Sequence, residues 1–134
     1  MIDFNFYLSK YIEEGSVLGF LEEITGFKIC SVNIENKDAL GVLLFLKVNG
    51  DLKVSFNLAF PDHVNIISSS EQLAEALSKH FRTKVIFFST HDYDEREFFM
   101  IDEFGKKFAV NIQDEDEEGE PIEDLKIIDK IEFY

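Results

Sequence analysis

Two adjacent segments near the middle of the chain constrain the fold more than any other feature. Residues 41–48 form a nearly continuous apolar run, and in residues 52–60 apolar side chains alternate with small or polar ones. Between them stands the pair Asn49-Gly50, which suits the positive backbone dihedrals of a type I′ turn. The pattern predicts a β-hairpin in which one strand is buried more fully than the other.

Three further segments carry apolar side chains at helical spacing. The first follows Asp3, a candidate N-cap, and covers residues 4–12; the second covers residues 17–26 and ends at a glycine. The third, residues 70–81, is preceded by Ser69 and has Gln72 three residues later, which is the spacing of a capping box. We therefore expect two short N-terminal helices and one central amphipathic helix.

The remaining apolar segments are predicted to be strands. They cover residues 30–34, 85–88, 98–101, 108–112 and 125–133. Phe104-Gly105 marks a turn between two of them, and the last strand is expected to pair back on residues 108–112. Strands that follow one another in runs, with few strand-helix-strand alternations, indicate the α+β class with a largely antiparallel sheet. The length of 134 residues predicts a single domain over residues 1–134.

Charge is abundant and uneven. The net charge is −14, and from residue 91 onward sixteen acidic residues face five basic ones. Such a field repels nucleic acids and anionic lipid surfaces and attracts basic proteins. We therefore expect a basic protein partner and neither direct nucleic-acid nor membrane binding. The absence of an apparent secretory leader or membrane-length apolar run, and the single cysteine, lead us to expect a cytoplasmic protein.

The densest acidic block lies between two predicted strands. Its six carboxylates are those of Asp114, Glu115, Asp116, Glu117, Glu118 and Glu120. Two interpretations stand: a solvated hairpin tip, or a surface that faces a cationic partner. A calcium loop of the EF-hand type is disfavoured, because position twelve, which needs a bidentate Glu, is Leu125 and the flanks read as strands.

A second acidic group follows the predicted strand at residues 85–88. In the functional interpretation it is a binding loop, with Tyr93 as an aromatic anchor and Asp92, Asp94 and Glu95 facing a basic partner. The alternative is a polar hairpin loop.

Catalytic and metal-binding motifs are not evident in the sequence. His63, His80 and His91 fall on different predicted elements, and Cys30 has no neighbouring Cys or His at metal-ligand spacing. There is no glycine-rich phosphate loop and no nucleophile elbow. We therefore predict no enzyme activity, no cofactor and no metal site. A pocket that gathers Cys30, a histidine and a carboxylate would reopen the enzyme hypothesis.

One part of the chain resembles a known group of proteins. A helix and strand from Glu71 to Phe88, an acidic loop, and then Phe99-Met-Ile-Asp-Glu-Phe-Gly-Lys-Lys-Phe-Ala-Val110 are similar to a pattern in small bacterial immunity proteins, including those of contact-dependent growth-inhibition systems. The resemblance implies a cytoplasmic inhibitor that binds one cognate toxin domain, often a nuclease, and covers its active site. The alternative hypothesis is an acidic adaptor, regulatory or DNA-mimic domain that inhibits no toxin.

Overall fold

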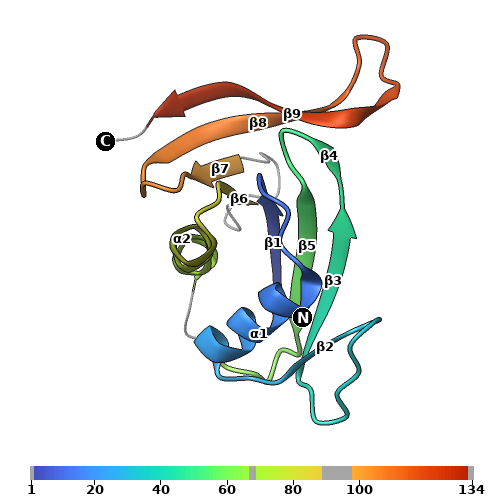
Figure 1. Cartoon of the computed structure of the whole chain (residues 1–134), viewed down its shortest axis with the longest axis vertical. Coiled ribbons are helices and arrows are strands. Elements are labelled where there is room, and N and C mark those ends of the chain that lie inside the picture. The colour runs from blue at the N-terminus through green and yellow to red at the C-terminus, as the bar shows by residue number, and fades with distance from the viewer. Residues whose placement is uncertain (1, 67–68, 89–97, 133–134) are drawn as a thin grey trace.

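A single strongly curved sheet forms the body of the molecule (Figure 1). The computed structural model describes residues 2–66, 69–88 and 98–132. Across these residues the sheet has nine strands in the order β2-β3-β5-β1-β6-β7-β8-β9-β4, accompanied by two helices. The elements are β1 (Ile2–Leu8), α1 (Glu14–Thr25), β2 (Ile29–Ser31), β3 (Gly41–Lys47), β4 (Asn49–Gly50), β5 (Val54–Phe60), α2 (Ser70–Phe81), β6 (Val85–Phe88), β7 (Phe98–Ile101), β8 (Lys107–Glu115) and β9 (Pro121–Glu132).

The predicted fold class is wrong. Strands make up 46% and helices 20% of the described residues, and the sheet is mixed, because β2 pairs with β3 and β4 pairs with β9 in parallel. The expected arrangement of two N-terminal helices and a central helix fails at residues 4–12. Most of that segment lies in β1, which pairs with β5 along its whole length and with β6 near its end.

The error at β1 has a simple physical origin. Phe4 and Leu8 are four residues apart, a spacing that fits both a helical face and every second residue of a strand. Phe6 lies between them and is buried with both, whereas Asp3 and Asn5 are exposed. A helix would place Phe6 away from Phe4 and Leu8, so this period-two pattern fits only a strand.

Helix α2 confirms the predicted capping box. The Ser69 hydroxyl accepts a hydrogen bond from the Gln72 backbone N–H at 3.2 Å, and the Gln72 side-chain oxygen accepts one from the Ser69 N–H at 2.9 Å. Helix α1 ends at Gly26, which has the left-handed φ of 77° that terminates many helices. Both helices cover one face of the sheet.

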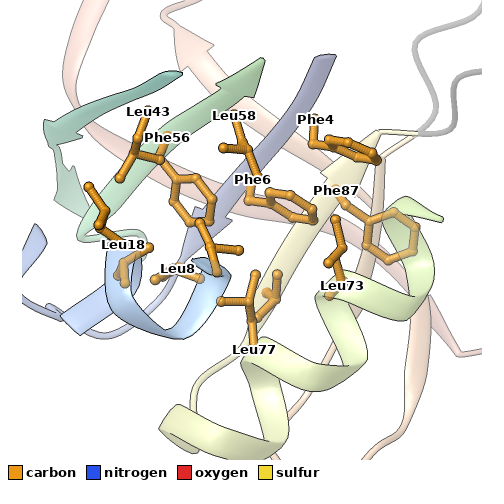
Figure 2. Close-up of a cluster of buried hydrophobic side chains, with 14 of the residues drawn as sticks. Phe4, Phe6, Leu8, Leu18, Leu43, Phe56, Leu58, Leu73, Leu77 and Phe87 are labelled. Atoms are coloured by element: carbon orange, nitrogen blue, oxygen red, sulfur yellow. The ribbon is translucent and has the colours of Figure 1, made fainter. Parts of the chain in front are cut away.

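The larger hydrophobic core lies between that face and the helices. Figure 2 shows side chains from β1, β3 and β5 meeting those of Leu73 and Leu77 on α2 and Leu18 on α1. The rings of Phe6 and Phe56 lie 5.2 Å apart at its centre. This core fixes the orientation of the central strands.

A second, smaller core lies on the opposite face of the sheet. Its buried residues are Leu52, Ile86, Met100, Phe108 and Val110, with Leu125 and Ile127 of β9 packed against them. The hairpin of β8 and β9 therefore folds over the end of that face. In Figure 1 it crosses above the ends of β1, β5 and β3, on the far side from the helices, and its tip extends beyond β4.

The predicted central hairpin is confirmed, but its type I′ turn is wrong. β3 pairs with β5 in antiparallel register, and only Gly50 of the Asn49-Gly50 pair has a positive φ, at 101°. These two residues instead form β4, which pairs with β9 at Asp124 and Leu125. A Cβ on Gly50 would lie 2.2 Å from the Leu125 carbonyl oxygen, so the glycine permits the close approach that joins β9 to the hairpin.

Of the two strands of this hairpin, β3 has the more apolar sequence, yet it is less buried than β5. β5 lies between β1 and β3 and alternates between buried and half-buried residues. Among the described strands, β3 has the short β2 as its neighbour on the other side, and their pairing stops at Leu43. We call the face of the sheet opposite the helices the outward face. The second core lies on this face but does not extend over β3. As a result, Val42, Leu44 and Leu46 are exposed.

Candidate functional site

The acidic block is the end of the β8–β9 hairpin, as predicted. β8 and β9 pair antiparallel from Phe108–Glu132 to Glu115–Pro121, with a three-residue tip at residues 117–119. The Asp116 N–H donates to the Glu120 carbonyl at 2.8 Å, and the Gly119 N–H donates to the Asp116 carbonyl at 3.1 Å. With Gly119 at φ 81°, this is a type I turn followed by a glycine bulge. The acids are therefore presented on a paired hairpin.

The Asp116 carboxylate has a structural role within this turn. Its Oδ1 accepts hydrogen bonds from the backbone N–H groups of Glu118 and Glu120 at 2.8 and 2.9 Å. Such local bonds are the reason that Asp is favoured at the first position of turns. Of the six predicted contact residues in the block, Asp116 is thus the one whose carboxylate already has partners.

The turn between β7 and β8 repeats this geometry. Asp102 Oδ1 accepts from the Phe104 and Lys106 N–H groups at 2.9 and 2.8 Å, and Gly105 has φ 84°. The sequences Asp102-Glu-Phe-Gly-Lys106 and Asp116-Glu-Glu-Gly-Glu120 therefore encode the same turn twice. Apart from Asp116, the acids at the tip are not needed to form it.

We call residues 114–124 the acidic arm. It contains eight carboxylates and no lysine or arginine, and each of its acidic residues is exposed. In the described part of the chain, the ion pairs join Lys106 to Glu132 and Lys107 to Glu71 and Glu75, and none includes an acid of the arm. The arm therefore presents a concentrated negative charge without a neutralising partner.

Six of the ten predicted contact residues lie in the part of the chain that the structure describes. Asp114, Glu115, Asp116, Glu117, Glu118 and Glu120 all lie on the arm. The predicted loop residues Asp92, Tyr93, Asp94 and Glu95 lie outside the described residues. Sequence reasoning omitted Glu123 and Asp124, which continue the arm along β9. Their closeness to the acidic block in the sequence was the available signal.

Asp114 also acts on a side chain of the sheet. Partial burial raises the pKa of the Tyr7 phenol, the negative charge of Asp114 raises that pKa further, and a hydrogen bond with Ser55 lowers it. Tyr7 lies on the outward face of β1, opposite Ser55 of β5. The negative charge at the base of the arm therefore acts on the outward face of the sheet at Tyr7.

His80 and Cys30, two of the groups considered for catalysis, lie on different elements, α2 and β2. His80 stacks on Phe20, with ring centroids 4.1 Å apart, and Cys30 is a half-buried residue of β2. Two surface pockets, of about 280 and 360 Å³, are lined by neither Cys30 nor a histidine. Among the residues that the structure describes, no three His, Cys, Asp or Glu side chains are grouped to hold a metal ion.

Within the described ranges, neither helix has both the length and the apolar character needed to cross a bilayer. Comparisons with protein-family models, with curated proteins and with solved structures find no match to this chain.

Proposed function

We propose that this chain is a cytoplasmic immunity protein that neutralises a cognate basic toxin domain, a nuclease in the favoured case, through its acidic surface. The observation that carries the proposal is the acidic arm, whose eight carboxylates are exposed and take part in none of the ion pairs found among the described residues. The resemblance of residues 71–110 to small bacterial immunity proteins adds the biological setting.

Inhibition would follow from substitution of carboxylates for phosphates. A nuclease binds its substrate with lysine and arginine side chains arranged along a groove. Carboxylates accept charge-assisted hydrogen bonds from the same groups, so the arm can occupy such a groove and exclude the nucleic acid. The surrounding negative field also accelerates encounter, because electrostatic steering raises association rates by roughly 10- to 1,000-fold at low salt.

The hairpin suits this role mechanically. Its strands are paired as far as Glu115 and Pro121, and Asp116 adds two hydrogen bonds within the tip. A segment that is ordered before binding loses less conformational entropy when it binds. The paired strands therefore present the arm in a form ready for contact.

The test uses two variants with the same change in net charge. The arm variant carries Asp114→Asn, Glu115→Gln, Glu117→Gln, Glu118→Gln and Glu120→Gln and retains Asp116. The control variant carries Glu13→Gln, Glu23→Gln, Glu35→Gln, Asp38→Asn and Glu103→Gln, all at exposed positions away from the arm.

Each variant and the wild type is used to capture partners from the native cell, and the captured protein is then expressed alone and together with this chain. The proposal predicts a basic protein that is retained by the wild type and the control, is lost by the arm variant, and is toxic unless this chain is present. A retained partner without toxicity would support the alternative, an acidic adaptor, regulatory or DNA-mimic domain. Equal retention by all three proteins would refute the arm as the interface.

A further inference from the structure

The outward face of β3 carries an exposed aliphatic stripe. Val42, Leu44 and Leu46 are 53%, 51% and 54% exposed, and all three point away from the helices. Beyond Leu43, β3 has a strand neighbour on one side only within the described residues. A contiguous apolar stripe next to an open sheet edge marks a contact surface more often than isolated exposed side chains do.

The neighbouring strands continue this face with uncharged side chains, except for Asp3 of β1, which pairs with Ala59 and is exposed. Register pairs Val42 with Ala59, Leu44 with Asn57 and Leu46 with Ser55, and the next strand adds Asn5 and Tyr7. The Asn57 side-chain amide donates to Asn5 Oδ1 at 2.9 Å, so these two polar groups already satisfy each other. Asp3 bounds the face at its Val42 end. From Leu44 to Tyr7 the side chains named here are uncharged, so this part can be dehydrated without removing water from an ion.

The same face is hollowed beside β6 and bounded by acid at one end. A pocket of about 360 Å³ is lined by Asn5, Phe6, Tyr7, Ser55 and Phe88. The charge of Asp114 reaches Tyr7 on this face, and the β8–β9 hairpin crosses above the ends of β1, β5 and β3 (Figure 1). We call this pocket, together with the β3 stripe and the side chains between them, the outer trough.

We infer that the outer trough and the acidic arm form one composite interface, in which the trough takes an apolar segment of the basic partner while the arm takes its lysine and arginine side chains. This inference rests on the proposed function and identifies the second half of its binding surface. An apolar centre beside a charged margin is the usual anatomy of a specific protein interface, and Tyr7 is of a residue type favoured at such centres.

Charge complementarity selects this occupant over a second copy of the chain. A copy docked on the trough would bring a further net charge of −14, including its own arm, to an area already bounded by uncompensated carboxylates. A basic segment with apolar side chains satisfies both parts of the surface. The trough would then supply specificity, whereas the arm would supply attraction to any polycation.

The test uses two synthetic peptides with the same length and number of lysines, one with leucine and the other with serine at all remaining positions. The trough variant is Leu44→Thr with Leu46→Thr. The control variant is Val32→Thr with Phe104→Thr, which removes highly exposed apolar side chains that lie outside the trough. Affinities are measured for the wild type, both variants and the arm variant, and urea midpoints verify folding.

The wild type should bind the leucine peptide at least about 10-fold more tightly than the serine peptide, because half-exposed leucines become buried. The trough variant should abolish this ratio, and the control variant should retain it. Amide NMR shifts of residues 42–46 and 55–57 should move with the leucine peptide only. A ratio unchanged in the trough variant, or shifts confined to the arm, would overturn the composite interface.

Failure of the proposed function gives a different result. If the arm variant binds the serine peptide as tightly as the wild type does, the arm is not a polycation site, whatever the leucine-to-serine ratio shows. Light scattering measures the oligomeric state and so tests whether a second copy of the chain occupies the trough. A dimer that dissociates in the trough variant would replace the basic partner with a second copy and refute the inference.

Discussion

The two related turns provide a prediction that separates structure from function within the acidic surface. Asp102 and Asp116 each accept two backbone hydrogen bonds of nearly equal length, 2.8 and 2.9 Å. Their environments differ, because Asp102 is only 8% exposed whereas Asp116 is exposed on the arm. The replacements Asp102→Ala and Asp116→Ala therefore remove the same bonds from two different settings.

The expected magnitudes differ for two reasons. A hydrogen bond contributes about 1 kcal/mol net, so the loss of two bonds at Asp102 should lower the free energy of unfolding by about 2 kcal/mol. In Asp116→Ala, water can replace the carboxylate as the acceptor for the Glu118 and Glu120 N–H groups, because this turn is exposed. Removal of that charge also relieves repulsion from neighbouring acids such as Glu115 and Glu117, which offsets part of the loss. We expect Asp116→Ala to cost less than about 1 kcal/mol.

Urea unfolding measures both values. With a slope near 2 kcal/mol per molar urea, Asp102→Ala should lower the midpoint by about 1 M and Asp116→Ala by less than half of that. The slope itself should not change. The explanation is that Asp102 and Asp116 make the same turn, one buried and one exposed. It would be refuted if the urea midpoint fell equally in both variants, or fell further in Asp116→Ala than in Asp102→Ala.

Two more predictions address the closure of the sheet and the electrostatics at the base of the arm. Gly50→Ala should destabilise the protein by about 2–4 kcal/mol in the same urea assay, because Gly50 has a positive φ and the added Cβ would meet the Leu125 backbone. The control Gly19→Ala, in helix α1, should stabilise the protein by about 0.5–1 kcal/mol. Equal effects of the two replacements would contradict the close approach of β4 and β9. Tyr7 should ionise above its ordinary pKa of 10.0 in an ultraviolet titration, and Asp114→Asn should lower that pKa. Because the folded-state pKa is raised, the associated stability should be present below about pH 10 and lost as the pH rises through the raised value; an unchanged titration in Asp114→Asn would place the arm away from Tyr7.

Local patterns in the sequence were enough to predict several elements. The capping box at Ser69 and Gln72 predicts the start of α2, and Phe104-Gly105 predicts the turn between β7 and β8. Each of these signals depends on residues within five positions of one another. β1 was mistaken for a helix because Phe4 and Leu8 satisfy two periods at once, and only the intervening Phe6 distinguishes them.

Long-range features were not predictable in the same way. The turn type at Asn49-Gly50 is overridden by pairing with β9, more than seventy residues away. The apolar content of β3 predicts burial, yet exposure depends on where β2 ends and on how far the β8–β9 hairpin covers the sheet. For the candidate site, the acidic block was visible in the sequence. Its relation to Tyr7 and to the β3 stripe depends on the curvature of the sheet.

The most direct test of the central claim is the association rate of the captured basic partner as a function of salt, from about 20 mM to about 500 mM. The wild-type and control rates should fall steeply over this range. The arm variant should start at least about 10-fold lower and fall less steeply, because five of the eight carboxylates of the arm have been neutralised. An arm variant whose rates match the wild type at every salt concentration would contradict a role for the arm in binding.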